Sequence, residues 1–564
     1  MLTKLTIKNF KKFDDVEIEL GNPVVFVGPN NSGKTTALQA LALWELGLKR
    51  WLEKRGAETK RKQRTGVVIN RKDLLTTPIP ETNLLWRNLQ VRQGKKAGKT
   101  GTENIKIQIC LEGIFQDSQE WKFGLEFDYH NEETLYCRPE ITDHNLDELL
   151  KGPFKEFSIA FLPPMSGLSD REHQKTVGEI DFLVGQGRTA EVLRNLCYRL
   201  SSNQHSQNSS ERWKTIKNKM AKLFGTEIID PTLVSERGEI EMSYRYNGIV
   251  LDISSSGRGF QQILLLLAYL ECHPNSILLL DEPDAHLEII RQKQIYEVLS
   301  STSKELGCNV LIASHSEVLL DEAAGRDTVI AFLGKPHRIN NKSQLRKSLV
   351  NIGFDQFLQA EQKGWVLYLE GSSDLKILLE FARKLKHKAF KSLEDVFVKY
   401  VSNQPSKAQE HFYGLKEAKD NLLGVALFDN LNAILQNNDF YQETQWNKKE
   451  IENYLCTKQV LQKWATKKYP HHFQVMTTCI EDLEKSFETL RKPSPWSSEI
   501  KVTDDFLNPL FDNFFDKLGL PNSFQKTDYH ELIEFLDLKY VDQEVSQKLD
   551  LVYTMSQKAK PILI

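Results

Sequence analysis

The chain has 564 residues, of which 40% are hydrophobic and 27% are charged, and its formal net charge is −2. This length exceeds what one hydrophobic core supports and predicts about three or four domains. The near-neutral charge gives no indication of a nucleic-acid partner. The longest apolar run, Ile263 to Leu270, is much shorter than the roughly 20 residues that a bilayer requires. We therefore expect a soluble globular protein with no membrane association.

The beginning of the chain and its cysteines indicate a reducing compartment. Residues Met1 to Ile7 predict a strand and not a signal peptide. Seven cysteines are scattered along the chain and none forms a C-x-x-C pair, so neither a zinc site nor a disulfide framework is indicated. We expect a cytoplasmic protein.

Residues 28–35 read Gly-Pro-Asn-Asn-Ser-Gly-Lys-Thr and match the phosphate-binding-loop pattern G-x-x-x-x-G-K-[ST] at each fixed position. An apolar strand, Val24 to Val27, precedes the loop, and helix-forming residues follow it. The glycines allow backbone N–H groups to surround phosphate oxygens at a helix N-terminus. Lys34 is expected to reach the β- and γ-phosphates, and the Thr35 hydroxyl to ligate Mg²⁺. The predicted nucleotide-binding residues are Asn30, Asn31, Ser32, Gly33, Lys34, Thr35 and Thr36.

Basic residues follow the first predicted helix. They are Lys49, Arg50, Lys54, Arg55, Lys60, Arg61, Lys62, Arg64, Arg71 and Lys72, and a basic loop lies at residues 94–101. Such a run is typical of a solvated face, whereas the alternative is a surface that tracks nucleic-acid phosphates.

Antiparallel strands are predicted at 105–112 and 122–129, a buried strand at 158–162, helices over 180–226 with a polar tip at 201–210, and two strands within 239–253.

Three further segments carry residues suited to nucleotide chemistry. Ser254 to Gln262 opens a long apolar helix, and its Ser/Gly-rich start at Ser256 and Gly257 predicts either a second anion site or an ordinary helix cap. An apolar strand ends at Asp281 and Glu282, where Asp281 suits the metal's water shell and Glu282 suits orientation of the attacking water. The alternative is a capping role for the Asp281 region. His315 follows a third apolar strand and is a candidate γ-phosphate contact.

These four elements, in this order, resemble the ATP-binding-cassette ATPases of the SMC, Rad50 and RecF type over roughly residues 1–340. The resemblance implies ATP as the nucleotide, with Mg²⁺. It also implies a head-to-head dimer, in which the signature loop of one subunit closes on the nucleotide held by the other. The signature here reads Ser-Ser-Gly-Arg-Gly where the family has Leu-Ser-Gly-Gly-Gln, so the contact falls on Ser255 or Ser256. There is no long coiled coil, which argues against chromosome tethering.

The second half of the chain contains two more strands that end in acids. Trp365 to Leu369 leads into Glu370 and Gly371, and Gly424 to Phe428 leads into Asp429. In a parallel sheet both carboxylates would lie at one edge, where clustered acids bind Mg²⁺. The alternative interpretation is two ordinary strand ends.

The second half also resembles a known nuclease-type domain. A Glu-Gly strand end followed by a later Asp-x-Asp is similar to the TOPRIM domain, and the order of an ATPase followed by TOPRIM resembles the OLD (overcoming lysogenization defect) family, which includes anti-phage nucleases. Glu452 is a third candidate ligand by this resemblance, although Glu450 and Glu452 alternatively begin a solvated helix. Leu431 stands where the second Asp of Asp-x-Asp is expected.

We therefore predict an α/β protein with an ABC-type P-loop ATPase domain at 1–345, including a helical insertion at about 180–226, a TOPRIM-like domain at 362–465 and a helical C-terminal region at 466–564. The leading hypothesis is an ATP-regulated, metal-dependent nuclease in anti-phage defence. The alternatives are an ATPase sensor or scaffold with a non-cleaving domain and, third, a RecF-type repair ATPase. The predicted catalytic residues are Glu282, His315, Glu370, Asp429 and Glu452, and the predicted metal ligands are Thr35, Asp281, Glu370 and Asp429. The expected partners are DNA or RNA, a second copy of the chain and a partner defence protein.

Overall fold

The computed structural model describes residues 1–56, 66–94, 102–115, 120–140, 154, 157–202, 209–323, 326–339, 352–417, 419–431 and 434–561. The chain forms two compact units, Met1–Val350 and Asn351–Ile564. The domain boundary predicted near residue 345 lies outside the described residues. Among the described residues, no helix combines the length and apolar character needed to cross a membrane.

The first unit begins with an antiparallel sheet of order β2-β1-β7-β8-β9-β4. Its strands are β1 (Leu2–Phe10), β2 (Phe13–Glu19), β4 (Val67–Asn70), β7 (Ile107–Ile114), β8 (Glu120–Asn131) and β9 (Thr134–Pro139). Buried and partly buried residues alternate along β9, as expected for a sheet with one face on the core. The antiparallel pair predicted near residues 105–129 is confirmed as β7 and β8.

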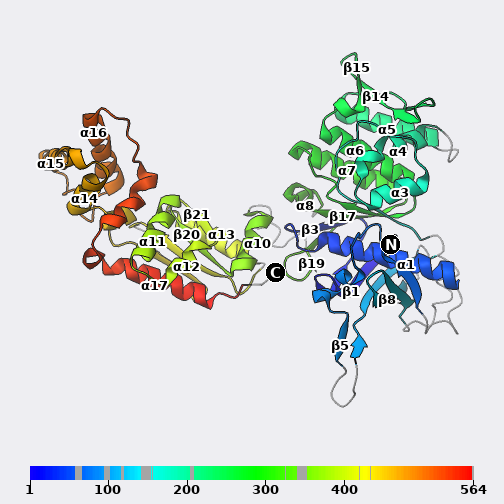
Figure 1. The fold of residues 1–564 in the computed structure, drawn as a ribbon, viewed down its shortest axis with the longest axis horizontal. Helices are drawn as coiled ribbons and strands as arrows, with labels where there is room; N and C mark the ends of the chain where they lie inside the picture. The colour runs from blue at the N-terminus through cyan, green and yellow to red at the C-terminus, as the bar shows by residue number, and fades with distance from the viewer. Residues whose placement is uncertain are drawn as a thin grey trace. The chain divides into compact units, whose positions relative to one another are not determined.

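A second sheet of order β10-β16-β17-β3-β18-β19 is parallel except for its last strand. Its strands are β3 (Val24–Val27), β10 (Ile159–Leu162), β16 (Ile277–Asp281), β17 (Asn309–Ser314), β18 (Thr328–Ala331) and β19 (His337–Arg338). Strands β3, β10 and β16 are buried along their whole length, which is typical of a parallel sheet covered on both faces. Helix α1 (Lys34–Arg55) packs against strands of both sheets and shares one hydrophobic core with them (Figure 1).

The remaining helices of the first unit cluster beside the parallel sheet. They are α3 (Val177–Gly185), α4 (Leu193–Ser201), α5 (Ser209–Phe224), α6 (Arg258–Cys272), α7 (Ile289–Glu305) and α8 (Glu317–Ala323). The helical region predicted over 180–226 is confirmed as α3, α4 and α5. Helix α6 packs against α4, α5 and α7, and it is almost wholly buried from Phe260 to Glu271.

Short strands complete the first unit. They are β5 (Arg92–Gly94), β6 (Thr102–Asn104), β11 (Glu227–Ile228), β12 (Thr232–Val234), β13 (Glu239–Glu241), β14 (Ser243–Tyr246) and β15 (Ile249–Asp252). Three strands, β13, β14 and β15, lie where two were predicted within 239–253, and the turn between β14 and β15 has positive φ at Asn247 and Gly248.

The second unit contains a parallel sheet of order β21-β20-β22-β23. The strands are β20 (Trp365–Leu369), β21 (Val398–Tyr400), β22 (Leu423–Phe428) and β23 (Tyr441–Gln445), and the helices among them are α10 (Phe354–Lys363), α11 (Ser372–Lys384), α12 (Ala389–Glu394) and α13 (Pro405–Lys416). Strands β20 and β22 are neighbours, so their carboxyl ends lie at the same edge of the sheet.

Helices follow the sheet of the second unit to the end of the described chain. They are the short helix η7 (Ile451–Tyr454), α14 (Lys458–Lys468), α15 (Phe473–Thr489), α16 (Asn508–Leu518), η10 (Lys526–Phe535) and α17 (Gln543–Lys558). The aromatic residues around α16 are core residues: Phe511 is fully buried, with its ring centroid 5.0 Å from that of Trp464. Helix α17 contacts β20 and β22, so one hydrophobic core spans the sheet and these helices.

Candidate functional site

The phosphate loop lies between β3 and α1, at the carboxyl end of a central parallel strand. Gly33 has φ 111°, and a side chain there would place its Cβ 2.9 Å from the Phe13 ring. Lys34 Nζ donates hydrogen bonds to the carbonyl oxygens of Gly28 and Pro29, each at 2.8 Å. Burial lowers the pKa of Lys34. The loop is therefore held closed on its own lysine, which is the group expected to meet phosphate.

Asp281 is the last residue of β16, which lies two strands from β3 in the sheet, and it contacts the first residues of α1. Its Oδ1 accepts a hydrogen bond of 3.1 Å from the Thr35 hydroxyl. Burial raises the pKa of Asp281 to about 6. The two residues predicted to hold Mg²⁺ in the ATPase are thus in direct contact across the sheet, and a cation beside them would favour the charged carboxylate.

Glu282 and His315 also lie together, although they end different strands. The Glu282 Oε1 and His315 Nδ1 atoms are 3.6 Å apart. The proximity of His315 lowers the pKa of Glu282, and the proximity of Glu282 raises the pKa of His315. Glu282 has φ 50°, and its N–H donates to Ala313 O at 2.8 Å, which fixes the direction of this strained backbone. The carboxylate and imidazole therefore lie beside Asp281 at one edge of the sheet.

The sequence prediction gave no nucleotide role to Asp284 or Lys12 at this edge, whereas it did assign Ser32 to nucleotide binding. Asp284 is buried and accepts a hydrogen bond of 2.9 Å from Ser314. Lys12 Nζ donates to Asn31 O in the loop at 2.7 Å. The Ser32 hydroxyl is buried and has no hydrogen-bond partner within the described structure. Lys12 gave no signal in the sequence because it lies in the turn between β1 and β2, well before the motif.

The signature stretch lies at the exposed start of α6. Ser254, Ser255 and Gly257 are exposed, and the Ser256 hydroxyl donates to Ile253 O at 2.6 Å. Gly257 is the N-cap of α6 and supplies no side-chain cap. The described hydrogen bonds of this stretch remain within residues 252–261 and do not reach the phosphate loop of the same chain.

The second unit brings Glu370 and Asp429 together through a residue that sequence reasoning missed. The Asn403 amide nitrogen donates to Glu370 Oε2 at 2.8 Å and to Asp429 Oδ2 at 3.0 Å. Asn403 Oδ1 accepts the Asp429 N–H at 3.1 Å. The two acids predicted from separate strand ends therefore share one hydrogen-bond donor at one edge of the sheet.

Two further carboxylates enlarge this cluster. Asp374, on α11, accepts the Glu370 N–H at 3.1 Å, and burial raises its pKa to about 6. Glu452 is 2% exposed, and burial followed by the Glu450 charge raises its pKa to about 8. Burial, together with Glu370, raises the pKa of Asp429 to about 9. Like charges held this close in a partly dry site resist ionisation together.

Lys526 brings positive charge to this cluster from η10. Its Nζ is 3.8 Å from Glu452 Oε1, and the nearby carboxylates raise the pKa of Lys526. Glu452 Oε1 is buried without a hydrogen-bond partner in the described structure. The cluster therefore contains more carboxyl groups than this one lysine can pair with.

Glu450 and Leu431 have structural roles. Glu450 is the N-cap residue of η7, and its carboxylate accepts the Thr503 N–H, so it is turned to backbone partners. Leu431 donates its N–H to the Gln445 side chain at 3.0 Å.

Among the residues that the structure describes, no three His, Cys, Asp or Glu side chains converge closely enough to hold a metal ion as they stand. The acids form a cluster but not yet a coordination shell.

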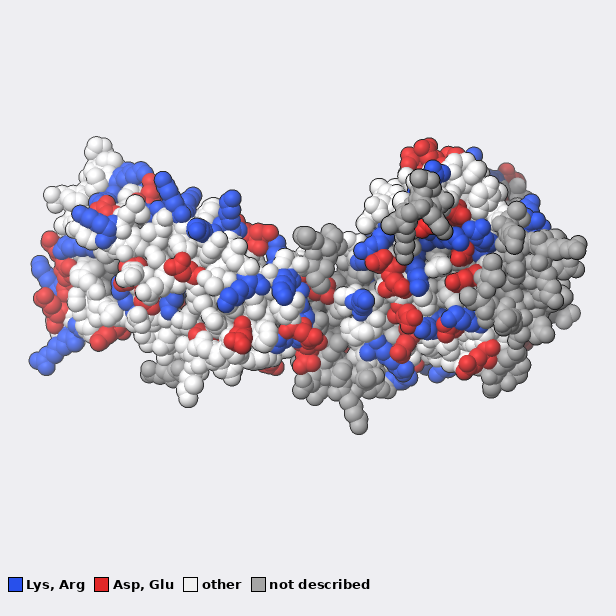
Figure 2. Space-filling model, turned by 90° about the horizontal axis from the view of Figure 1, so that it is seen from below, with Lys and Arg blue, Asp and Glu red and all other residues white. Residues whose placement is uncertain are grey.

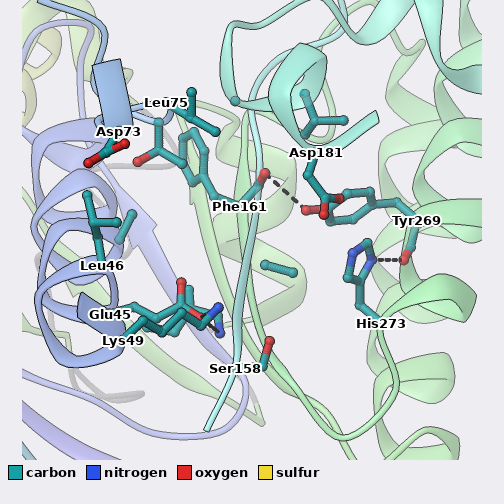
Figure 3. Close-up of a pocket in the computed structure, with 16 residues that line it drawn as sticks. Glu45, Leu46, Lys49, Asp73, Leu75, Ser158, Phe161, Asp181, Tyr269 and His273 are labelled. Carbon is teal, nitrogen blue, oxygen red and sulfur yellow. Dashed lines mark hydrogen bonds and ion pairs between the residues drawn. The ribbon is translucent and has the colours of Figure 1, made fainter. Parts of the chain in front are cut away.

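A cavity of about 280 Å³ lies along α1, beside β10 and the end of α6 (Figure 3). Glu45 accepts the Ile159 N–H and pairs with Lys49, both at 2.7 Å. The Tyr269 hydroxyl donates to Phe161 O at 3.1 Å. Glu45 is eleven residues after Lys34, which corresponds to roughly 16 Å along a helix, so this cavity is distinct from the phosphate loop.

The described part of the basic segment is largely neutralised by acids. Arg50 pairs with Glu53 and Asp73, and Arg71 pairs with Glu133. On the face drawn in Figure 2, charges of both signs are interspersed over the described residues. These pairings favour the solvated-face interpretation for the described residues. Residues 57–65 and 95–101, which hold the other predicted basic positions, lie outside the described structure.

The fold and the first site define a P-loop ATPase: a phosphate loop enters a helix from a central parallel strand, and the acids Asp281 and Glu282 lie at the end of β16, which β17 separates from that strand. Comparison with known families agrees. Residues 1–158 match the family described as "AAA ATPase domain", and residues 221–321 match the family described as "AAA domain, putative AbiEii toxin, Type IV TA system". The first match includes the phosphate loop, and the second includes Asp281, Glu282 and His315. The prediction of a P-loop ATPase is confirmed.

Matches to individual proteins are more limited. An OLD nuclease of Thermus scotoductus (strain ATCC 700910 / SA-01) is 46% identical over 43 residues, which is 8% of this chain and 8% of the relative. Among solved structures, the SMC head domain from Thermotoga maritima is 16% identical and covers 60% of this chain and 98% of its own, with a TM-score of 0.32. An Smc head with an extended coiled coil, derived from Pyrococcus furiosus, is 15% identical over 60% of this chain and 96% of its own, with a TM-score of 0.35.

Proposed function

We propose that this protein is an ATP-regulated, metal-dependent nuclease of the OLD type that acts in anti-phage defence. The observation that carries the proposal is the meeting of Glu370 and Asp429 at one edge of a parallel sheet, with Asp374 and Glu452 beside them. The short match to an OLD nuclease supports the same activity. The family description that names a putative toxin supports a role in defence, in which a partner defence protein is also expected.

In the ATPase, Lys34 would leave the loop carbonyls for the β- and γ-phosphates of ATP, since those phosphates offer a stronger charged partner. Thr35 and Asp281, already in contact, would hold Mg²⁺. Glu282 would orient the attacking water, and His315 would contact the γ-phosphate from beside Glu282. The exposed signature at Ser255, Ser256 and Gly257 would close on the nucleotide of a second copy, in a head-to-head dimer.

In the second unit, the oxygen donors have the chemistry that suits a divalent cation, and they would have to draw closer together to coordinate it. Several buried carboxylates face one lysine, and Glu452 Oε1 lacks a hydrogen-bond partner in the described structure. Glu370 and Asp429 would hold the cation, with Glu452 as a further oxygen donor. A cation there would stabilise the charge that develops on a phosphodiester. Lys526 would add positive charge for the nucleic-acid phosphate, while Asp374 orients Glu370 through the backbone N–H.

The test is cleavage of plasmid DNA and of RNA with Mg²⁺ or Mn²⁺, with and without ATP. We expect cutting by the wild type, and at least about 100-fold less cutting by Glu370→Ala, because the site loses a carboxylate that a phosphoryl-transfer metal needs. The matched control is Glu380→Ala, since Glu380 lies on α11 and pairs only with Arg383 among the described residues. Equal cutting by Glu370→Ala would assign the nuclease to another site.

A second candidate is an ATPase sensor or scaffold whose second unit binds a partner or nucleic acid without cutting it. Leu431 favours this function, because it stands where a second Asp is expected and its N–H is bound to Gln445. Absence of cutting by the wild type under every condition, with ATP hydrolysis intact, would favour the sensor. Retained binding of nucleic acid in that case would distinguish a nucleic-acid scaffold from a protein-binding one.

A further inference from the structure

The carboxylate cluster of the second unit contains one uncharged side chain at its centre. Asn403 directs its amide nitrogen at both Glu370 and Asp429, at 2.8 and 3.0 Å. These are the two acids expected to hold a cation. The amide donor therefore uses the same carboxylate oxygens that a divalent cation would use.

The orientation of this amide is set by the backbone. Asn403 Oδ1 accepts the N–H of Asp429 at 3.1 Å. Turning the amide over would place its oxygen against two carboxylates and its NH₂ against a backbone N–H, which pairs acceptors with acceptors and donors with donors. Only the observed orientation gives hydrogen-bond partners to both carboxylates and to the Asp429 N–H, so the amide nitrogen faces the acids.

The backbone around Asn403 also favours this residue type. Ser402 and Asn403 both have positive φ, at 50° and 55°, just after the short strand β21. Asn, Asp and Gly adopt this region more readily than other residues. Ser402 donates its N–H to Glu370 O at 3.2 Å, which ties the turn to the end of β20. The turn thus holds the Asn403 side chain between the two strand ends.

We infer that Asn403 is a neutral stand-in for a cation: it holds Glu370 and Asp429 together, and a divalent cation must displace its amide to bind them. The inference rests on the proposed metal-dependent nuclease and adds how that site controls its metal occupancy. Because hydrogen bonds from an amide to carboxylates are charge-assisted, breaking two of them weakens metal binding. Occupancy would then rise only at a higher metal concentration than an open carboxylate pair needs.

Two substitutions suit the positive φ and separate the possible roles of Asn403. Asn403→Gly removes the competing donor without backbone strain. Asn403→Asp keeps an oxygen for the Asp429 N–H and replaces the donor with a third carboxylate oxygen. The matched control is Asn430→Ala, because the Asn430 amide donates to Asn447 O and contacts no carboxylate by any described hydrogen bond.

The experiment is calorimetric titration of the nucleotide-free full chain with Mn²⁺, without nucleic acid, using Glu370→Ala to identify the heat that belongs to this site. We expect Asn403→Gly to bind Mn²⁺ roughly tenfold more tightly than the wild type and Asn403→Asp to bind more tightly still. Asn430→Ala should match the wild type. Without Mn²⁺, Asn403→Asp should melt at a lower temperature than the wild type. Added Mn²⁺ should bring its melting temperature back to that of the wild type.

Each outcome decides one point. Unchanged or weaker Mn²⁺ binding by both Asn403 variants would overturn this inference and leave the proposed nuclease standing. A lowered melting temperature of Asn403→Asp that Mn²⁺ does not restore would assign Asn403 a purely structural role and overturn it as well. Absence of any Glu370-dependent Mn²⁺ binding in the wild type and in both variants would instead overturn the proposed metal-dependent function.

Discussion

The two acidic sites of this protein are built on the same kind of sheet edge but are held closed in different ways. In the ATPase, a charged group is held within the phosphate loop: Lys34 donates hydrogen bonds to the carbonyl oxygens of Gly28 and Pro29. In the second unit, a neutral amide occupies the position between two acids. Under the proposed functions, the first site would bind an anion and the second a cation. Each site is therefore held together by hydrogen bonds from or to the same groups that its proposed ligand would contact.

The sharpest way to test the first half of this comparison is to remove its charge. We expect Lys34→Ala to lower ATP hydrolysis by at least about 100-fold, because the lysine neutralises charge that develops on the phosphates. Phosphate release measures the effect. Lys54→Ala is the control, since Lys54 is an exposed lysine on the same helix. A Lys34 variant that keeps more than a tenth of the wild-type rate would contradict the assigned role.

The second half of the comparison is tested by asking whether the two sites work separately. We expect Asp429→Ala to lower nucleic-acid cleavage by about 100-fold, because a metal ligand is lost, while ATP hydrolysis stays within about twofold of the wild type. Both rates are measured on one preparation. Asp439→Ala, at an exposed position further along the same unit, serves as the control. An equal loss of ATP hydrolysis and cleavage would show that the two sites are coupled and do not work separately.

The two sites also differ in how much of them the sequence reveals. The phosphate loop is continuous, so eight adjacent residues identify it. Asp281 ends one strand with an apolar centre, and His315 directly follows another. Asn403 follows a three-residue strand and lies 33 and 26 residues from the acids that it joins. Its contacts depend on the strand order β21-β20-β22, which one sequence does not display.

Long-range packing explains the remaining differences. Lys526 approaches Glu452 because the C-terminal helices share a core with the sheet, and helical periodicity does not predict that placement. Glu450 and Glu452 look alike in sequence, yet Glu450 caps η7 while Glu452 faces the acid cluster. Phe506 to Phe515, by contrast, was predictable as core because aromatic residues at helical spacing bury much area.

A pH experiment tests the sheet that carries the second site through His411, a residue outside the acid cluster. Burial, with a contribution from the Lys399 charge, lowers the pKa of His411 to about 4. Its ring lies between the Tyr368 hydroxyl, 2.9 Å from Nδ1, and the Gln356 side chain, 2.7 Å from Nε2. The folded state therefore resists protonation that the unfolded state accepts near pH 6.5. His411 favours folding fully above pH 6.5, and this contribution is lost as the pH falls toward 4.

The expected size at pH 5 is about 2 kcal/mol of unfolding free energy lost relative to pH 7 through His411 alone. Denaturant titrations at the two pH values measure it. His411→Gln should lose about 2 kcal/mol less than the wild type over the same interval, since glutamine does not titrate. An identical pH dependence of the two proteins would show that His411 is protonated as readily in the fold as in the unfolded chain.

The smallest expected effect distinguishes the glycines of the two sites. Gly33 has φ 111°, and an added Cβ would lie 2.9 Å from Phe13, whereas Gly371 has extended backbone and no close neighbour. We expect Gly33→Ala to destabilise the first unit by about 1–2 kcal/mol, the cost of a side chain in the left-handed region. Gly371→Ala should change stability by less than about 0.5 kcal/mol, as at an ordinary helix N-cap. Unfolding curves and ATP affinity are the two measurements.

The ATP affinity decides what the stability difference means. If Gly33 shapes the phosphate loop, Gly33→Ala should weaken ATP binding by about tenfold, because the backbone N–H groups that face phosphate turn with φ. Gly371→Ala should leave ATP binding unchanged and alter Mn²⁺ binding little, because the acids of the second site are placed by strand ends and by Asn403. A large loss of Mn²⁺ binding in Gly371→Ala would mean that this glycine is as essential to its site as Gly33. The phosphate loop and the acid cluster would then not differ in the way proposed, in which backbone conformation shapes the first and side chains shape the second.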